Sequence, residues 1–439
     1  MDQASLRHLW RVCIWVIVTI SALATTQVQA TTTRNFTSSE MTLQSAIKRT
    51  IANTPDLHEF TFKQEAIEGE IKTASRPPPL NAGIEVDNFL GTGEVADIKG
   101  TELTLMLSSI IEFGNKINAR TAFVNAKTSV VEVQKQVRTL DVLAEVTRRY
   151  IDVLAQQALL DTQNEAETLA RYTYQTVTKR VDAGASPEFA QKRAGAALAR
   201  ARLDVLTAEQ NRLGLIRSLA IMWGEQNPTF THLKGDLFAL QSSPPMTTLV
   251  TNLLDSPNIK VYAQAARVQE AKIRLAQASN QADVSWTAGI RHINGIDETA
   301  LVAGVSMALF AGDRNLGEYQ KQNAILGQLE QQKKSATLNL YHQLNMALLA
   351  RNNALLNVQT LQKSIIPPLE EALEMVKQAY LDGRFSYLEW VSTRQELLNA
   401  KQTLIQSAKD AHQRGADIES LTAQPLVETI NTSLSSNTQ

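Results

Sequence analysis

The stretch VSMALFAGDRN (residues 305–315) contains the change of pattern on which the fold depends. Up to Phe310 it alternates with the period of two that is typical of a half-buried strand, and after Gly312 a heptad-like helical pattern follows. The stretch LMLSSIIEFGNK (residues 105–116) makes the same change at Gly114. We therefore predict that the chain runs twice from a strand directly into a helix, with Gly114 and Gly312 as the strand–helix junctions.

The helices predicted after these junctions are very long. Residues 115–183 contain no Gly and no Pro and are rich in Ala, Val, Leu, Gln and Glu, which favours an uninterrupted helix. At 1.5 Å per residue, such a helix is roughly 100 Å long. The second long helix, about residues 313–381, contains Gly317, Gly327 and a Pro pair at 367–368, so we expect interruptions and a bend near the Pro pair. Two shorter helices are expected to lie end to end beside each long helix.

The same order of segments occurs twice, which indicates two tandem repeats of about 200 residues. The segment NTPDL (residues 53–57) corresponds to DSPNI (residues 255–259), and LARARLDVLTA (residues 198–208) corresponds to LNAKQTLIQSA (residues 398–408). The first repeat, residues 31–223, is predicted to contain a helix, a strand pair at about 80–111, the long helix 115–183 and a returning helix 186–223. The second repeat, residues 244–423, is predicted to contain a helix, a strand pair at about 283–310, the long helix 313–381 and a returning helix 386–421. An equatorial insert (224–243) joins the repeats, and residues 424–439 are predicted to form a flexible tail.

Charge and cysteine content exclude several classes of function. The formal net charge of -1 gives no electrostatic attraction to nucleic acid. Residues 1–30 have the pattern of a cleaved signal peptide, because Arg7 and Arg11 precede an apolar run that ends in the small-residue sequence VQA (residues 28–30). The single cysteine, Cys13, lies inside this segment and too early for lipid attachment. We expect an exported protein that is not a lipoprotein and has no thiol in its mature form.

The sequence contains no recognisable catalytic or metal-binding constellation. The histidines are scattered without HxH or HExxH spacing, and no mature cysteine can join them as a ligand: His8, His58, His232, His292, His342 and His412. We therefore predict no enzyme activity, no cofactor and no dedicated metal site. Metal export would not contradict this prediction, because a conduit must bind its cargo weakly enough to release it.

Four segments alternate with period two and are predicted to be strands, for example residues 284–290 and 301–309. One interpretation is a soluble sheet with one wet face. The other is an outer-membrane barrel, in which strands of about 10 residues alternate lipid-facing and lumen-facing side chains. Export, the lack of a second apolar stretch long enough to span a membrane, and the long helices attached to the strands favour the barrel. The smallest membrane barrels have about eight strands, so several copies must share one closed barrel.

With these features the chain resembles the TolC-type outer membrane efflux protein family, and within it the CzcC-like branch that serves divalent cation efflux. The resemblance is carried by IEFGNKINAR (residues 111–120), ALFAGDRNLGEYQKQNA (residues 308–324) and AYLDGRFSYLEWVSTRQELLNAKQTL (residues 379–404). It implies a mixed α/β membrane protein: a homotrimer with a 12-stranded outer-membrane β-barrel, four strands per chain, continuous with a long periplasmic α-helical barrel. It also implies a location in the bacterial outer membrane with a periplasmic extension.

The resemblance further implies a function and partners. The chain would be the outer-membrane channel of a tripartite efflux system, a passive conduit for divalent heavy-metal cations. Its partners would be an inner-membrane pump of the resistance-nodulation-division (RND) type, a periplasmic adaptor (membrane fusion) protein, and outer-membrane lipid. Two alternatives stay open. One is a multidrug or type I secretion exit duct, because the pump largely selects the cargo. The other is a periplasmic coiled-coil adaptor, which would have one hairpin and a compact β-domain.

The turns between the long and returning helices carry the expected adaptor contacts. By position in the family, these are Gly184 and Ser186 in the first repeat, and Gly383 and Ser386 in the second. The same residues also have structural interpretations. The glycines can close the preceding helices in a left-handed conformation, Ser186 can cap the next helix, and Ser386 with Glu389 fits a capping box.

The resemblance also assigns candidate residues for a pore gate. Tyr380 matches a tyrosine that latches neighbouring helices in the multidrug member, and Glu389 matches a pore-facing carboxylate there. Phe385 stands where that member has an arginine, and Ser392 where it has a second carboxylate. We therefore expect hydrophobic closure through Tyr380, Phe385 and Tyr387 in place of a salt-bridged latch. The pore role of Glu389 and its role as a capping residue both stay open.

Overall fold

The computed structural model describes residues 40–89, 92–93, 100–309 and 311–425. The predicted signal peptide, Phe310 and nearly all of the predicted tail therefore lie outside the described residues. The first half contains α2 (Leu43–Asn53), α3 (Pro55–Ala74), β1 (Asn81–Asp87), β2 (Glu102–Ile111), α4 (Lys116–Asp182), α5 (Glu188–Ala220) and the short 3-10 helix η3 (Ile221–Trp223). The second half contains α6 (Met246–Leu254), α7 (Pro257–Ala278), β3 (Val284–Ile293), β4 (Glu298–Met307), α8 (Ala311–Thr360), η4 (Leu361–Ile365), α9 (Ile366–Leu381) and α10 (Tyr387–Thr422).

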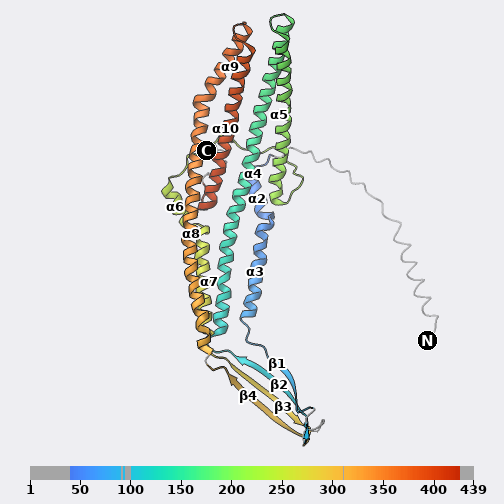
Figure 1. Ribbon diagram of the computed structural model, residues 1–439, viewed down its shortest axis with the longest axis vertical. Helices are drawn as coiled ribbons and strands as arrows, with labels where there is room; N and C mark the ends of the chain where they lie inside the picture. Colours follow the sequence, from blue (N-terminus) through green and yellow to red (C-terminus); the bar gives the residue numbers. More distant parts are fainter. Residues whose placement is uncertain (1–39, 90–91, 94–99, 310, 426–439) are drawn as a thin grey trace, which may run out of the picture. The chain divides into compact units, whose positions relative to one another are not determined.

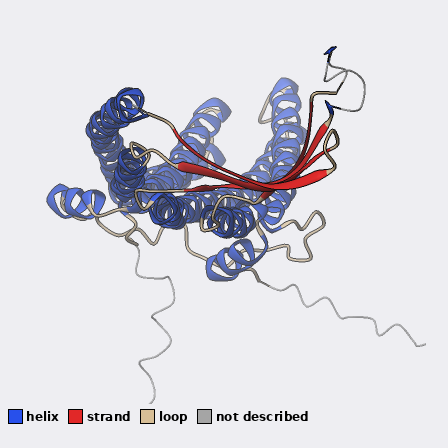
Figure 2. Cartoon of the chain, turned by 90° about the horizontal axis from the view of Figure 1, so that it is seen from below, coloured by secondary structure: helices blue, strands red, loops and turns tan. Residues whose placement is uncertain are grey.

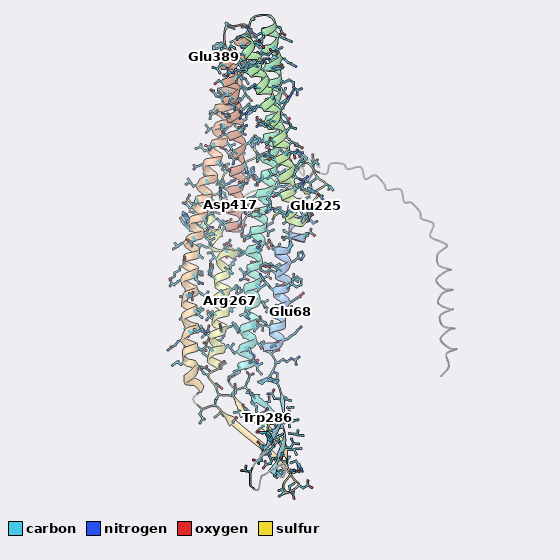
Figure 3. All side chains as sticks on the ribbon, turned by 45° about the vertical axis from the view of Figure 1, so that its right-hand side comes forward. Glu68, Glu225, Arg267, Trp286, Glu389 and Asp417 are labelled. Carbon is cyan, nitrogen blue, oxygen red and sulfur yellow. The ribbon has the colours of Figure 1, made fainter. Side chains whose placement is uncertain are left out.

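The long helix α4 organises the helical part. It contacts α2 and α3 along one portion of its length and α5 along another, so these three shorter helices follow one another beside it (Figure 1). It also packs against α7 and α10 from the second half. Both helical hairpins turn at the end of the helices away from the sheet, as Figure 3 shows by the distant positions of Glu389 and Trp286.

The second long helix is interrupted at one place only in its described course. The five residues of η4 form a π-helical turn between α8 and α9, and the Pro pair occupies the first positions of α9. Because Pro has no backbone N–H, the ladder of helical hydrogen bonds must change here, and the wider π turn accommodates the change. The expectation that Gly317 and Gly327 interrupt this helix is wrong. Both lie inside α8, and the space where a Cβ would stand is open at each.

The four strands form one antiparallel sheet in the order β1-β2-β3-β4 (Figure 2). This confirms the prediction of four strands in the chain. The register places an apolar row across all four strands, and every member of it is more than half exposed: Ile84 (71%), Leu105 (54%), Ile290 (53%) and Leu301 (88%). The adjacent row on the opposite face runs from Glu85 through Thr104 to Arg291 and Ala300. None of the described residues covers this apolar row, so the sheet presents it to its surroundings.

The largest core lies at mid-length of the helices, where the segment between η3 and α6 packs against α4. Phe230, Leu233 and Leu237 of this segment are buried in it. Leu233 forms a parallel bridge with Met41, and the Tyr150 hydroxyl lies 2.9 Å from the Met41 carbonyl oxygen. Among the described residues, every helix is too short or too polar to cross a bilayer.

Candidate functional site

The two hairpin tips lie at the same end of the helices and use the same turn (Figure 1). Gly184 and Gly383 both have positive φ angles, +68° and +76°. The Gly184 amide donates to the Val181 carbonyl oxygen at 2.9 Å, and the Gly383 amide donates to the Tyr380 carbonyl oxygen at 3.0 Å. A residue with a Cβ is strained in this left-handed conformation, so glycine favours the closure of each long helix.

The helices that return from the tips begin differently. In α10, the Ser386 amide donates to Glu389 Oε2 at 2.8 Å and the Glu389 amide donates to Ser386 Oγ, so the capping box is present. In α5, Pro187 occupies the N-cap position and no side chain caps the helix, so the expectation that Ser186 acts as the cap is wrong. Ser186 lies in the turn itself.

Glu389 is exposed at the tip, but its carboxylate is already engaged. Its Oε2 accepts hydrogen bonds from both the amide and the hydroxyl of Ser386, at 2.8 and 2.7 Å. The hydrogen bonds from the Ser386 hydroxyl and amide lower the pKa of Glu389, because they stabilise its ionised form. The carboxylate therefore stays ionised and fixed in the first turn of α10.

Of the three aromatic residues expected to close the tip, Tyr380 and Tyr387 come together in the chain and Phe385 does not. Tyr380 is buried, and its ring centroid lies 5.1 Å from that of Trp390. Tyr387 packs against the same buried cluster, whereas Phe385 is 49% exposed and lies outside it. Trp390 is 1% exposed and is the aromatic residue that packs beside Tyr380.

Arg180 is a tip residue that the sequence analysis missed. It lies in the last turn of α4, and its Nη1 donates to the main-chain carbonyl oxygens of Tyr380 at 3.0 Å and Leu381 at 2.9 Å. Its guanidinium carbon lies 5.0 Å from the centroid of the Tyr380 ring. One side chain of the first hairpin therefore binds the end of α9 in the second. A cation in the last turn of a helix was visible in the sequence, but it suggested interaction with its own helix end only.

The first strand–helix junction is held by backbone conformation and by charge. Gly114 has a φ of +79°, and a Cβ at this position would lie 2.8 Å from the Ala278 carbonyl oxygen. Lys116 forms an ion pair with Asp283 at 2.6 Å, and Asp283 also accepts a hydrogen bond from the Phe113 amide. The second junction differs. Helix α8 begins at Ala311, so Gly312 lies in its first turn and not ahead of the helix.

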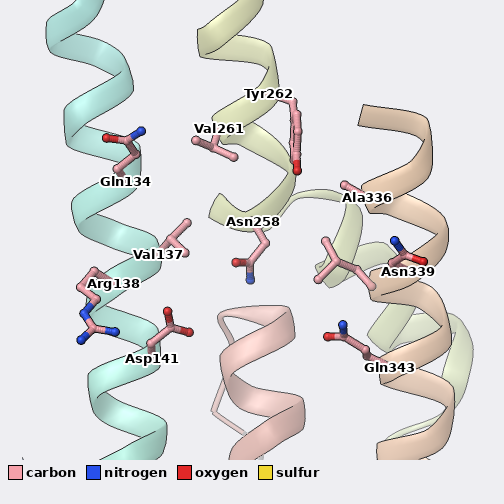
Figure 4. A pocket seen from close by; sticks show the side chains of 11 residues that line it. Gln134, Val137, Arg138, Asp141, Asn258, Val261, Tyr262, Ala336, Asn339 and Gln343 are labelled. Atoms are coloured by element: carbon pink, nitrogen blue, oxygen red, sulfur yellow. The ribbon is translucent and has the colours of Figure 1, made fainter. Parts of the chain in front are cut away.

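A pocket of about 490 Å³ lies between α4, α7 and α8 (Figure 4). Its lining combines amides, among them Gln134, Asn258 and Gln343, with the Asp141 carboxylate. Burial raises the pKa of Asp141, opposed by the nearby Arg138. No second carboxylate, histidine or cysteine lines the pocket, and no group of three or more metal-ligating side chains converges anywhere in the described part of the chain.

Comparisons with known proteins show which proteins this chain resembles. The family model described as "Outer membrane efflux protein" matches residues 46–225. The chain is 23% identical over 303 residues to the cobalt-zinc-cadmium resistance protein CzcC of Cupriavidus metallidurans, covering 68% of this chain and 71% of CzcC.

Two solved structures extend the likeness over most of the chain. The crystal structure of CusC superimposes with a TM-score of 0.73 and 18% identity, covering 87% of this chain and 91% of CusC. The outer membrane protein VceC of Vibrio cholerae superimposes with a TM-score of 0.69 and 17% identity, covering 88% of this chain and 97% of VceC. These superpositions show that the chain shares their fold.

Proposed function

We propose that the chain is the outer-membrane channel of a tripartite efflux system, because it is similar to the TolC-type outer membrane efflux protein family and to the CzcC protein. It acts as a passive conduit and performs no chemistry on its cargo. The observation that carries this proposal is the exposed apolar row Ile84, Leu105, Ile290 and Leu301 on a sheet attached directly to the long helices. In water such a row is unfavourable, whereas lipid accommodates it.

Three copies complete the channel in this proposal. Strands β1 and β4 are the edges of the sheet, and open edges do not persist in lipid. Pairing of β4 with β1 of the next copy gives a closed barrel of twelve strands. The helical flanks support the same ring. Large apolar side chains are exposed on α3 and α5, including Phe62 and Leu206, and on α8 and α9, including Leu356 and Met375. These two sets can meet head to tail around a threefold axis.

The proposed cargo is a divalent heavy-metal cation, because the named relative CzcC is a cobalt-zinc-cadmium resistance protein. The proposed partners are an RND-type pump of the inner membrane and a periplasmic adaptor that contacts the tips near Gly184, Ser186, Gly383 and Ser386. In this arrangement the helices extend into the periplasm, after removal of a signal peptide. A drug or protein exit duct is the second candidate, since the same channel could serve another pump. The adaptor alternative is disfavoured, because the chain has two hairpins, each attached to a strand pair.

We place the gate at the tips, with Tyr380, Phe385 and Glu389 as candidates and Arg180 as an additional latch. Phe385 is exposed in the single chain, so it can contribute to closure only against another copy. In planar bilayers, the Phe385→Ala variant is expected to have a higher conductance than the parent channel. An unchanged conductance would remove Phe385 from the gate.

Two measurements test the proposed function. The mature protein should be found in the outer-membrane fraction as a heat-resistant trimer in detergent. A deletion strain should lose tolerance to one or more of Zn, Co, Cd, Ni and Cu, and keep its tolerance to a panel of drugs. Loss of drug tolerance alone would favour the second candidate. A monomer that is soluble without detergent would contradict both.

A further inference from the structure

The buried contact between the two hairpins near their tips, which we call the tip seam, contains hydrogen-bond donors without acceptors. Its core is formed by Val177, Ala190, Ala194, Tyr380 and Trp390. Four polar atoms in or beside it are buried and have no hydrogen-bond partner among the described residues: Arg180 Nε, Tyr380 Oη, Trp390 Nε1 and Arg394 Nε. Only five other buried side-chain atoms in the described part of the chain lack a partner. The tip seam is therefore the place where such atoms concentrate.

These four atoms are nearly all hydrogen-bond donors. The Arg and Trp N–H groups can only donate, and the Tyr hydroxyl is the single group that could also accept. Arg394 is 8% exposed, and no carboxylate of the described residues forms an ion pair with it. The buried Nε of Arg394 has lost its contact with water without gaining an acceptor, and burial also lowers the pKa of Arg394.

The surroundings of Arg394 add positive charge, and no carboxylate of the described residues pairs with it. Tyr387, Trp390 and Arg394 follow one another at intervals of three and four residues, so they share one face of α10. On the facing helix α5, the Arg193 guanidinium carbon lies 5.9 Å from the Tyr387 ring centroid. Along α10, Ser386 already engages the Glu389 carboxylate. Glu396 lies only two residues from Arg394, so it is exposed on a different face of the helix. The tip seam is thus cationic and rich in donors.

We propose that the tip seam receives an acidic side chain of the protein that docks on the hairpin tips, with its carboxylate accepting hydrogen bonds from Arg394 and Trp390. A carboxylate supplies two acceptor oxygens and the missing negative charge, and hydrogen bonds between ions of opposite charge are the strong ones. Exposed apolar side chains at the tips provide a rim for the same partner, with Phe189 at 64% and Leu388 at 58% exposure. This inference rests on the proposed function, because it assumes a partner at the tips.

The first test asks whether Arg394 lacks an acceptor before the partner binds. The full chain is purified in detergent, and the temperature at which the assembly dissociates is measured for the Arg394→Met variant. The expected temperature equals or exceeds that of the parent. As a positive control, Arg148→Met removes a cation that pairs with Asp417 at 2.9 Å and should lower the temperature. A clear fall for Arg394→Met would mean that the assembly itself, for example a second copy, already supplies the acceptor, and would overturn the proposal.

The second test identifies the acceptor by charge reversal in cells. Arg394→Glu should abolish cation tolerance, while the assembly still reaches the outer membrane and conducts ions. Arg200→Glu, at an exposed position of α5, should leave tolerance unchanged. Suppressors that restore tolerance to Arg394→Glu should replace Asp or Glu by Lys or Arg in a second protein. Unchanged tolerance, or suppressors confined to this chain, would overturn the proposal.

If the Arg394→Glu chain fails to assemble, the Arg394→Gln variant is tested in its place. Arg394→Gln should also lose cation tolerance, and unchanged tolerance would contradict the proposed role of the tip seam. Conductance separates this inference from the proposed function. If the parent chain itself fails to conduct ions, the channel assignment fails. If the parent chain conducts ions and only the Arg394 variants behave differently from expectation, the proposed role of the tip seam alone is refuted.

Discussion

The guanidinium of Arg180 binds the main-chain carbonyl oxygen of Tyr380 at 3.0 Å and lies 5.0 Å from the centre of the Tyr380 ring. The two residues are 200 positions apart and belong to different hairpins. Arg180 also binds the next carbonyl oxygen, that of Leu381, so it holds the negative end of the α9 dipole with a fixed positive charge. A movement that separates the two hairpins must break these contacts.

Removing this contact should favour an open tip. For Arg180→Gln we expect the closed tip to lose about 2 kcal/mol of stability relative to the open tip, because hydrogen bonds to a charged group are lost. This loss corresponds to roughly a 30-fold change in the ratio of closed to open tips. Arg180→Lys should have an intermediate effect, since an ammonium cannot reproduce the planar guanidinium on the ring. Single-channel conductance in planar bilayers measures the result.

The matched control for Arg180 is Arg171→Gln in the same helix. Arg171 pairs only with Glu167, four residues away, and its side chain is 55% exposed. Its replacement should leave the conductance unchanged. Equal effects of the two substitutions would show that the charge of α4 matters and not the contact with Tyr380.

Gly114 should be irreplaceable at the first strand–helix junction. For Gly114→Ala we expect a loss of stability of about 2 kcal/mol or more, because Ala is strained at a positive φ and its Cβ would lie against the Ala278 carbonyl oxygen. Gly214→Ala is the control. Gly214 lies within α5 with open space around it, so this replacement should stabilise the protein by roughly 0.5–1 kcal/mol. The dissociation temperature in detergent should move in opposite directions for the two variants.

The ion pair between Lys116 and Asp283 should contribute measurable stability. Its side chains are 11% and 32% exposed, so solvent screens the pair less than it screens an ordinary surface pair. In a double-mutant cycle with Lys116→Gln and Asp283→Asn, we expect a coupling of about 1–2 kcal/mol in the free energy of unfolding. Asp283→Asn should cost more than Lys116→Gln, because it also weakens the hydrogen bond with the Phe113 amide.

An exposed ion pair provides the comparison for this cycle. Lys63 and Glu59 lie one helical turn apart in α3, with side chains 46% and 56% exposed. Their coupling should not exceed about 0.5 kcal/mol. A coupling at the junction no larger than this would show that Gly114 and the backbone alone define the strand–helix transition.

His412 should make the middle of the helical part sensitive to acid. Its Nε2 lies 3.0 Å from the Leu237 carbonyl oxygen. Burial, together with the Arg351 cation, lowers the pKa of His412 against the opposing effects of this hydrogen bond and of Asp236. The unfolded chain therefore binds a proton more readily than the folded one. The stability that the neutral ring provides is complete above a pH of about 6.5 and is lost as the pH falls below it.

The difference between dissociation temperatures at pH 7.5 and pH 5.5 measures this effect. It should be smaller in His412→Gln than in the parent, because the amide can still donate to Leu237 but does not titrate in this range. His342→Gln, at an exposed position of α8, should keep the parental difference. A larger difference in His412→Gln would reverse the assigned sign of the pKa change.

Local sequence determined the elements of this protein because each depends on residues within a few turns. The Gly- and Pro-free run allowed the length of α4, period-two alternation produced the four strands, and Ser386 with Glu389 specified the start of α10. The same reasoning overestimated how strongly Gly317 and Gly327 disrupt their helix. The free-energy cost of one glycine in a long helix is small compared with the stabilising contacts on either side. Ser186 failed as a cap because the helix begins one residue beyond Pro187.

Only the tertiary structure decided which elements meet. The pairing of β2 with β3 joins the two halves, Asp283 reaches Lys116, and Arg180 reaches Tyr380. It also placed Trp390 beside Tyr380 and left Phe385 outside their cluster. Propensity and periodicity are properties of neighbours along the chain, whereas these contacts depend on how helices of this length align side by side. A shift of one turn in that alignment would give every one of these side chains a different partner, with no change in local sequence.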